Sequence, residues 1–562
     1  MFSLTSKSRK SIAILSAGAA ALLITGLGVS NATADNLTWD PSGSSAGPSN
    51  GGGTWNGSTS NWYDTTSSTG PVGWTNGDGA YFGAGSGGSG TYTVTLGSSG
   101  TYSTATLGVN NSGNAYVLDG SSGTVTGTGQ VVVNGGLTLQ NITLSGYKNI
   151  EVNTGGVVGS VLNINTGTTI SMPATNTNLF LSDVPNGGTS GTTGTVDING
   201  GSPTVGAITV AANGTNQTGI LNINSGTVTT TAIAGVTSKS AANVGSPTIV
   251  NLNGGTLNTY WITSTNKGDV VVNFNGGTLQ AHNNGGIGAA SSGYTMPTGS
   301  LNVQAGGAVT DSNAHTYWIQ SPLLHDAALG STPDGGLTIK DSPSAGTTQQ
   351  PSTVTLQGVN TYTGPTTVQG GGNLTLGGAA TSANGVALAA ATIADSSSVT
   401  IASNGVLTLA NDVTSANVAP TAATQVQALN MSGGGSISFF LSDTQSPTLS
   451  IGSKANVSGV NTINIFGFPS TAPSPTTSFT YGTYTLISDS LGGLSGGTFA
   501  FGNGNQTDTT SVGGNSYLLT LGSTDNLETL TVSAVPEPAT LGLFAIGGMA
   551  LVLLGRKRKA QI

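Results

Sequence analysis

The sequence contains no cysteine and very few charged residues, which limits how the protein is stabilised and what it binds. Its 562 residues include 12 Lys and Arg and 21 Asp and Glu, so charged residues make up 6% of the chain, against roughly 25% in ordinary soluble domains. Without cysteine the chain forms neither disulfides nor thiolate metal sites. Residues 35–535 hold no Arg and five Lys, against 20 acidic residues. Because such an acidic segment is a poor ligand for phosphate groups, nucleic acid is excluded as a partner.

Short apolar strands separated by glycine corners repeat along the middle of the chain. Val250–Leu257 reads Val-Asn-Leu-Asn-Gly-Gly-Thr-Leu, and Val272–Leu279 repeats it as Val-Asn-Phe-Asn-Gly-Gly-Thr-Leu. Apolar residues alternate with Asn, as in a strand with one buried face, and the Gly pair permits a tight corner. Looser copies begin at residues 162, 196, 221 and 301, so the six copies lie 22 to 34 residues apart. This spacing fits several short strands with their turns. It predicts an all-β, right-handed parallel β-helix in which each repeat is one coil and stacked Asn side chains form ladders.

The ends of this β-helix should differ from its middle. Four of the six tryptophans fall within residues 35–110, at positions 39, 55, 62 and 74. A solenoid needs a differently built first coil, since an open strand edge would template aggregation. We therefore expect an N-terminal cap over residues 35–110, β-helix coils over 111–410 and a C-terminal β-rich cap over 411–534. The alternative function for the first cap is that its tryptophans stack on sugars.

A more specific motif lies in the later part of the predicted coils. Its residues are Asn360, Thr361, Tyr362, Thr363, Gly364, Pro365, Thr366, Thr367 and Val368, and Gly372-Asn373-Leu374-Thr375-Leu376-Gly377 comes shortly after. Together with the segment before it, from about residue 302 to 378, it resembles the autotransporter-associated β-strand repeat. The resemblance implies an extracellular β-solenoid of passenger type.

The N-terminus predicts export. Lys7, Arg9 and Lys10 precede an apolar run over residues 12–29, and Ala32-Thr33-Ala34 supplies a small-x-small cleavage pattern. Residues 1–34 are therefore expected to be a signal peptide that is cleaved after Ala34. A retained membrane anchor is the alternative.

The C-terminal residues 535–562 predict a second transport signal. Val535, Pro536, Glu537 and Pro538 lead into an apolar run over residues 539–554, and the segment closes with Arg556, Lys557, Arg558 and Lys559. An apolar span followed by a basic cluster predicts a transmembrane helix with its charges in the cytoplasm. The whole order resembles the PEP-CTERM sorting signal of bacteria that make exopolysaccharide. That resemblance implies an exosortase-like processing enzyme, transient anchoring in the inner membrane, cleavage near Pro536–Pro538 and delivery to the outer surface or matrix. A plain single-pass anchor is the alternative.

Candidate catalytic residues are scarce. The three histidines are His282, His315 and His325, and the last two lie near Asp311, Asp326 and Asp334 in the sequence, which suggests metal or acid–base chemistry. A polysaccharide hydrolase would need paired carboxylates, and a lyase would need a base with cationic partners. Neither pattern is visible, so we expect no catalytic, metal or cofactor site. The hypothesis is a structural or adhesive matrix protein with exopolysaccharide as candidate partner. Its alternatives are a carbohydrate-binding surface protein and a polysaccharide lyase or hydrolase.

Overall fold

The computed structural model describes residues 34–535, except for 84–88, 98–99, 111–112, 155–158, 173–176, 183–190, 210–216, 236–246, 265–268, 289–299, 344–351, 378–390, 411–423, 444–445 and 469–474. Residues 1–33 of the predicted signal peptide, which include Ala32, lie outside the described residues, whereas Ala34 is described. The sorting residues from Pro536 onward also lie outside them. So does the apolar run 539–554. In the part that is described, no helix has the length and apolar character to cross a membrane.

The described residues form an all-β structure of strands that pair with the equivalent strands of the next coil. The first side of the coils is an eleven-stranded sheet whose neighbours all pair in parallel. Its strands are β2 (Gly53–Trp55), β6 (Thr91–Leu96), β9 (Ala115–Asp119), β12 (Gly136–Gln140), β15 (Ser160–Asn165), β18 (Thr193–Asn199), β20 (Thr218–Ser225), β22 (Thr248–Leu252), β24 (Val270–Phe274), β26 (Leu301–Val303) and β29 (Leu324–His325). We call this the first sheet.

The second side of each coil stacks in the same way. Its strands are β7 (Thr101–Thr104), β10 (Thr124–Gly127), β13 (Thr143–Ser145), β16 (Thr169–Ser171), β19 (Ser202–Thr209), β21 (Thr227–Ala234), β23 (Thr256–Thr263), β25 (Thr278–Ile287), β27 (Ala308–Asp311), β30 (Leu337–Lys340), β32 (Thr366–Val368), β34 (Val399–Ile401), β37 (Leu429–Met431) and β40 (Ala455–Val457). The long strands β19 and β25 each pair with strands of both the second and the third side. In these coils one strand therefore passes around a corner without a break.

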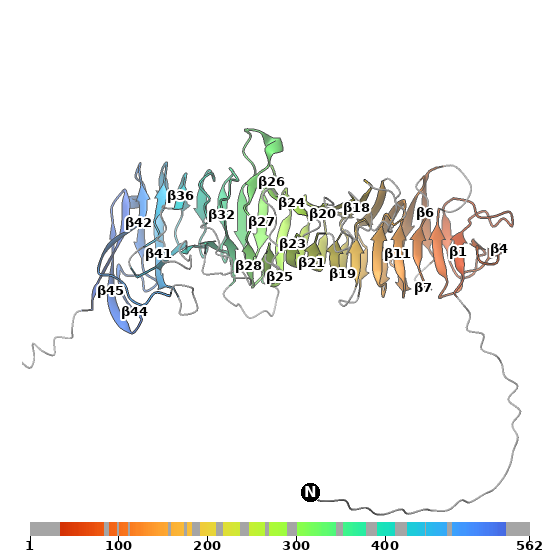
Figure 1. Cartoon of the computed structure of the whole chain (residues 1–562), viewed down its shortest axis with the longest axis horizontal. Coiled ribbons are helices and arrows are strands. Elements are labelled where there is room, and N and C mark those ends of the chain that lie inside the picture. Colours follow the sequence, from red (N-terminus) through yellow and green to blue (C-terminus); the bar gives the residue numbers. More distant parts are fainter. Residues whose placement is uncertain are drawn as a thin grey trace, which may run out of the picture. The chain divides into compact units, whose positions relative to one another are not determined.

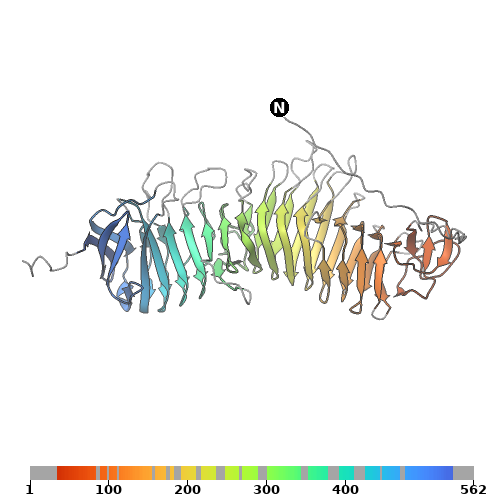
Figure 2. The same cartoon turned by 90° about the horizontal axis from the view of Figure 1, so that it is seen from below.

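The third side completes the coils. Its further strands are β5 (Gly79–Phe82), β8 (Leu107–Val109), β11 (Gln130–Val133), β14 (Asn149–Val152), β17 (Asn178–Phe180), β28 (Thr316–Ile319), β31 (Thr353–Leu356), β33 (Asn373–Gly377), β35 (Val406–Ala410), β38 (Ser436–Leu441), β41 (Gly459–Gly467) and β43 (Gly497–Ala500). Parallel pairing continues past residue 410, through β41 and β43. Figures 1 and 2 show strands of successive coils side by side in sequence order. This is a solenoid-like arrangement of parallel coils, while its right-handed winding stays a prediction.

Antiparallel strands lie at both ends of the stack. At the N-terminal end β1 (Asn36–Trp39) pairs in parallel with β5 and antiparallel with β3 (Trp62–Asp64), which pairs with β4 (Thr69–Val72). At the other end the parallel strands β36 (Thr424–Val426), β39 (Leu449–Ile451) and β42 (Gly482–Asp489) continue into antiparallel β46 (Leu527–Ala534), β45 (Asn515–Ser523) and β44 (Thr507–Val512). Two short 3-10 turns, η1 (Ala327–Leu329) and η2 (Leu494–Gly496), complete the described elements.

The core follows the repeated sequence. In the first sheet the register places Leu162, Val196, Leu221, Val250, Val272 and Leu301 in one row, and each is fully buried. Burying one such side chain contributes about 1.5–3 kcal/mol. The glycine corners also fit their places. A Cβ on Gly255 would lie 2.6 Å from Ile223 Cγ2, and Gly276 has a φ of +93°. The predicted repeat is therefore one coil, and the glycine at its corner permits the preceding coil to approach.

Candidate functional site

The outer surface of the first sheet carries the most regular arrangement of polar groups. Asn222 Nδ2 donates to Asp197 Oδ1, Asn251 to Asn222, Asn273 to Asn251 and Asn302 to Asn273, over 2.6 to 3.0 Å. These residues occupy one register row of β18, β20, β22, β24 and β26. The predicted side-chain ladder is confirmed, and we call it the amide ladder.

A second row runs beside the amide ladder. Asn199 donates to Asn165 over 3.4 Å, while Asn224 donates to Asn199 and Asn253 to Asn224, both over 2.9 Å. Neighbouring strands of a sheet are about 4.8 Å apart, so the amides repeat at this interval along the stack. An amide has two N–H donors and an oxygen with two lone pairs. Since each ladder bond uses one N–H and one oxygen lone pair, the outer surface keeps further donors and acceptors.

The residues of the predicted repeat motif join neighbouring coils. Asn360 is buried, and its Oδ1 accepts from the backbone N–H of Leu323 over 2.9 Å. Its Nδ2 donates to the backbone oxygens of Gly358 and Thr392 over 3.1 and 3.0 Å. Thr361 donates its backbone N–H to the oxygen of Leu323. Asn360 therefore satisfies backbone groups of the coils before and after its own, where the first side forms no regular strand.

Tyr362 fills the core beside Asn360. Its side chain is fully buried, and its hydroxyl lies 2.7 Å from Thr366 Oγ1, which lies 2.9 Å from Ser396 Oγ. Burial raises the pKa of Tyr362 well above its ordinary value, so the hydroxyl stays protonated. Thr367 lies beyond this contact and pairs with Thr338 and Thr400 in register. The motif positions therefore act in coil-to-coil packing.

Asp334 lies under the same motif and holds its backbone in place. Its carboxylate accepts from the backbone N–H groups of Gly336, Thr363 and Gly364 over 2.8 to 2.9 Å. Its Oδ2 also lies 2.8 Å from His325 Nδ1, whose ring places Nε2 3.0 Å from the Gly330 oxygen. Burial alone would raise the pKa of Asp334, but these donors hold it below its ordinary value. The pair is thus an internal support of the coil.

His325 does not meet the requirements of a general base paired with Thr363. Thr363 Oγ1 and Asp334 both approach Nδ1 of the ring, at 3.3 and 2.8 Å, and Nε2 faces a backbone oxygen. In a catalytic triad the nucleophile and the carboxylate bind opposite nitrogens. The hydrogen bond to Asp334 raises the pKa of His325, against a smaller effect of burial. His325 as imidazolium donates to both acceptors.

The other histidines lie apart from this pair. His282 Nδ1 lies 2.5 Å from Asn258 Oδ1 on the second side of the coils. Burial lowers the pKa of His315, and the charge of His282 adds to this effect. Of the suggested grouping of His315 and His325 with Asp311, Asp326 and Asp334, the structure forms the contact between His325 and Asp334. Over the residues that the structure describes, no three His, Asp or Glu side chains are grouped so that they could hold a metal ion.

The N-terminal tryptophans belong to the core. Trp39, Trp55 and Trp62 are at most 1% exposed and Trp74 is 8% exposed. Trp55 lies 5.2 Å from Trp62 and 4.8 Å from Trp74, measured between ring centroids, with steep angles between the rings. Such edge-to-face contacts stabilise a core. Because the ring faces are covered, these tryptophans cannot stack on sugars. The alternative function suggested for the N-terminal cap is therefore wrong.

The C-terminal segment matches a known sorting motif. Residues 534–559 match the PEP-CTERM protein-sorting motif. Of these residues the structure describes Ala534, the last residue of β46, and Val535, which is 38% exposed. No curated protein matches the chain. The predicted likeness of residues 302–378 to the autotransporter-associated repeat stays a prediction. The motif implies export through an exosortase-type sorting system and delivery to the cell surface.

Proposed function

We propose that the protein is a structural and adhesive component of the extracellular matrix, without catalytic activity, and that exopolysaccharide is its partner. The observation that carries this proposal is the amide ladder, which places four Asn amides and the carboxylate of Asp197 on five successive strands of the first sheet. A hydrated polysaccharide offers hydroxyl groups at regular intervals. Each hydrogen bond exchanged with such a chain contributes only about 0.5–1.5 kcal/mol, so retention depends on many contacts acting together.

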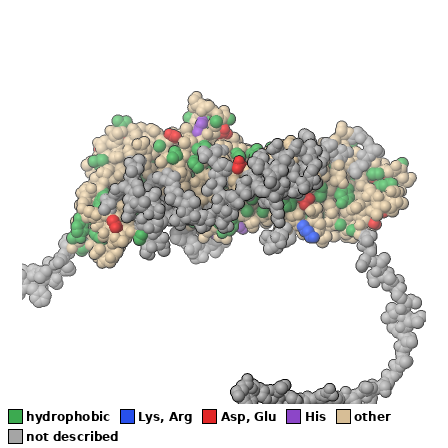
Figure 3. Space-filling view, viewed as in Figure 1, with side chains coloured by type: hydrophobic (Ala, Val, Ile, Leu, Met, Phe, Trp, Pro, Cys, Tyr) green, Lys and Arg blue, Asp and Glu red, His purple; other side chains and the backbone are tan. Residues whose placement is uncertain are grey.

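The sparse charge of the surface supports an uncharged partner. Figure 3 shows few Lys, Arg, Asp or Glu side chains on the face that it displays. Several acidic side chains are also occupied within the fold. Asp197 accepts from the amide ladder, Asp334 from three backbone N–H groups and Asp489 from the N–H groups of Ala455 and Leu491. These carboxylates support strands and turns, which favours a structural role over hydrolysis.

The sorting motif supplies the route. An exosortase-like enzyme would cleave near Pro536–Pro538 after the apolar run 539–554 has anchored the chain in the inner membrane. Residues 35–535 would then be released to the outer surface or the matrix.

A deletion strain tests the proposal. Cells without the protein should form aggregates that disperse at lower shear, and the wild-type gene should restore cohesion. A gene with Asn222→Val, Asn251→Val and Asn273→Val should restore it only in part. The matched control is Asn430→Val with Asn456→Val, since both residues lie on the second side of the coils. This gene should restore cohesion fully. Normal cohesion in the deletion strain would contradict the proposal. Release of sugars from the matrix by the protein itself would also contradict it.

A further inference from the structure

A small cavity opens on the outer surface where the second row of amides passes from β18 to β12. The register continues this row from Asn199 and Asn165 to Gln140 of β12 and Asp119 of β9. The cavity has a volume of about 380 Å³, within the range of ligand sites. Its lining side chains come from the ends of three successive strands and the corners after them, and they are Gln140, Asn141, Asn165, Thr166 and Asn199. We call this cavity the amide notch.

The hydrogen bonds of the second row are interrupted at the amide notch. Asn199 donates to Asn165, but Gln140 Nε2 donates to Asp119 Oδ2 over 3.0 Å, and Asp119 does not line the notch. Within the described part of the chain, Asn165 Nδ2 and Gln140 Oε1 therefore have no hydrogen-bond partner. The corner at residues 166–168 is one residue longer than the corners at 141–142 and 200–201, which accompanies the interruption. The notch thus contains a donor and an acceptor that the fold leaves unused.

The carboxylate of Asp119 determines how two amides of the notch are oriented. Its Oδ1 accepts from the backbone N–H of Ser121 over 3.1 Å and from Asn141 Nδ2 over 3.4 Å, while its Oδ2 accepts from Gln140. Burial would raise the pKa of Asp119, but these donors hold it below its ordinary value, so the group is ionised at neutral pH. An ionised carboxylate only accepts hydrogen bonds and therefore binds the NH₂ end of each amide. The oxygen ends of Gln140 and Asn141 remain available to a ligand.

The unused groups of the notch fit a hydroxyl group. A hydroxyl can accept one hydrogen bond and donate another, so it can accept from Asn165 Nδ2 and donate to Gln140 Oε1 at the same time. The Thr166 hydroxyl donates to the backbone oxygen of Asn199 over 3.4 Å and keeps its own oxygen as a further acceptor. A carboxylate or phosphate would gain no cation, because no lining residue is charged, and the charge of Asp119 would repel it. The notch therefore favours a neutral ligand with several hydroxyls.

We propose that the amide notch binds one sugar residue of a neutral polysaccharide, whose hydroxyls bridge Gln140 and Asn165. The second row continues from the notch through Asn199, Asn224 and Asn253, so further sugar residues of the same chain can contact these amides. The hydrogen bonds from Gln140 and Asn141 to Asp119 hold the notch in shape before a ligand binds, which lowers the entropy lost on binding. The inference rests on the proposed function and adds to it one site of defined shape.

Affinity gel electrophoresis of the exported protein tests this site. The gels contain hydroxyethyl cellulose, galactomannan or dextran as neutral probes, and alginate as the anionic probe. At least one neutral probe should retard the wild-type protein, and alginate should not. Asn165→Leu removes the unused donor at similar side-chain size and should weaken that retardation about three- to tenfold, the effect of losing about one hydrogen bond. Asn253→Leu is the matched control, since Asn253 belongs to the same row but does not line the notch, and it should change the retardation much less.

Several outcomes would overturn the inference. They are retardation by none of the neutral probes, equal retardation by alginate, and unchanged retardation of a folded Asn165→Leu variant. An equal loss in Asn253→Leu would assign binding to the row as a whole and would also overturn it.

A second variant keeps the test valid if circular dichroism shows that Asn165→Leu has not folded. Gln140→Met removes the unused acceptor instead and should weaken retardation by a similar factor; unchanged retardation would again overturn the inference. Failure of this site alone would leave the cohesion defect of the deletion strain intact. Failure of the proposed function would instead appear as normal cohesion in that strain.

Discussion

Replacement of Glu528 should change how the stability of the C-terminal sheet depends on pH. Glu528 lies on β46 and is fully buried, opposite Ile487 of β42. Its Oε2 accepts from the Ser523 hydroxyl, and its Oε1 is buried without a hydrogen-bond partner. Burial raises the pKa of Glu528 from 4.5 to about 7, while the bond from Ser523 opposes this only in part. The folded protein therefore keeps a proton that the unfolded chain loses at lower pH.

The sign and size of the effect follow from this difference in pKa. Between about pH 4.5 and 7 the folded state binds more protons than the unfolded state, so its free energy of unfolding falls as the pH rises. The total loss is about 3 kcal/mol at 1.36 kcal/mol for each pKa unit, and the contribution is constant above pH 7. Glu528→Gln places an uncharged amide of similar shape there and removes this dependence. Relative to wild type, it should gain about 3 kcal/mol between pH 4.5 and pH 8.

Hydrogen exchange at fixed pH measures this effect where it occurs. A comparison of the two proteins at the same pH cancels the intrinsic exchange rate, and peptides from β45 and β46 report opening of the sheet. At pH 8 these peptides should exchange more slowly in Glu528→Gln than in wild type. The ratio of the wild-type rate to the variant rate should be roughly a hundredfold larger at pH 8 than at pH 5. Peptides from β22 and β24 should not change. An equal difference at pH 5 and pH 8 would refute the argument from burial.

Three substitutions test the fold, and one measurement on the unchanged protein tests the route. Asp334→Ala leaves the N–H groups of three residues and a histidine without their acceptor, and should lower the free energy of unfolding in urea by about 3–5 kcal/mol; a loss below 1 kcal/mol would contradict the supporting role. Asn251→Ala cuts two bonds of the amide ladder and should cost about 1–2 kcal/mol. Leu252 is the next residue and its side chain is fully buried, so Leu252→Ala should cost about 2–5 kcal/mol. A larger loss for Asn251→Ala than for Leu252→Ala would contradict the assignment of Asn251 to the outer face and Leu252 to the core. Mass spectrometry of the surface protein should recover no peptide from residues 541–562, and an intact C-terminus would favour a plain anchor.

The regular part of the fold could be predicted because local sequence alone determines it. In Val250–Leu257 the alternation of apolar residues with Asn decides which side chains enter the core, and the Gly pair permits the corner. Identical residues in successive copies then fall into register, as Asn251 and Asn273 do. The amide ladder follows from that register without further information.

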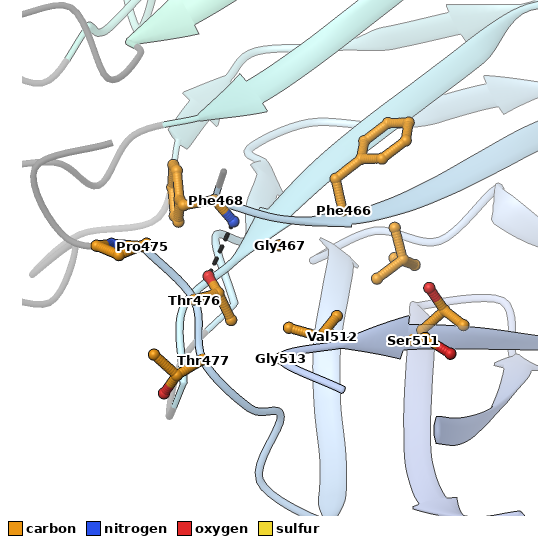
Figure 4. Close-up of a pocket in the computed structure, with 11 residues that line it drawn as sticks. Phe466, Gly467, Phe468, Pro475, Thr476, Thr477, Ser511, Val512 and Gly513 are labelled. Atoms are coloured by element: carbon orange, nitrogen blue, oxygen red, sulfur yellow. Dashed lines mark hydrogen bonds between the residues drawn. The ribbon is translucent and has the colours of Figure 1, made fainter. Parts of the chain in front are cut away.

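The irregular parts depend on contacts that no local pattern contains. His325, Asp334 and Thr363 meet although 9 and 29 residues separate them, because the turns between them decide which coil edges coincide. The Asp334-Gly335-Gly336 sequence indicates such a turn, but it does not indicate that Asp334 contacts His325 and Thr363. The groove lined by residues of β41 and β44 (Figure 4) arises where β44–β46 replace parallel coils with antiparallel strands. Since its walls come from β41 and β44, the sequence of either strand alone gives no indication of it.

The central claim is that the protein binds matrix polysaccharide without cleaving it, and co-sedimentation tests this directly. The exported protein is incubated with insoluble exopolysaccharide from the producing bacterium, and the pellet and supernatant are analysed. The account predicts that the protein pellets with the polysaccharide and that the supernatant gains neither reducing ends nor unsaturated sugars. Protein that stays in the supernatant, or sugar release that is lost on substitution of an Asp or His325, would contradict it.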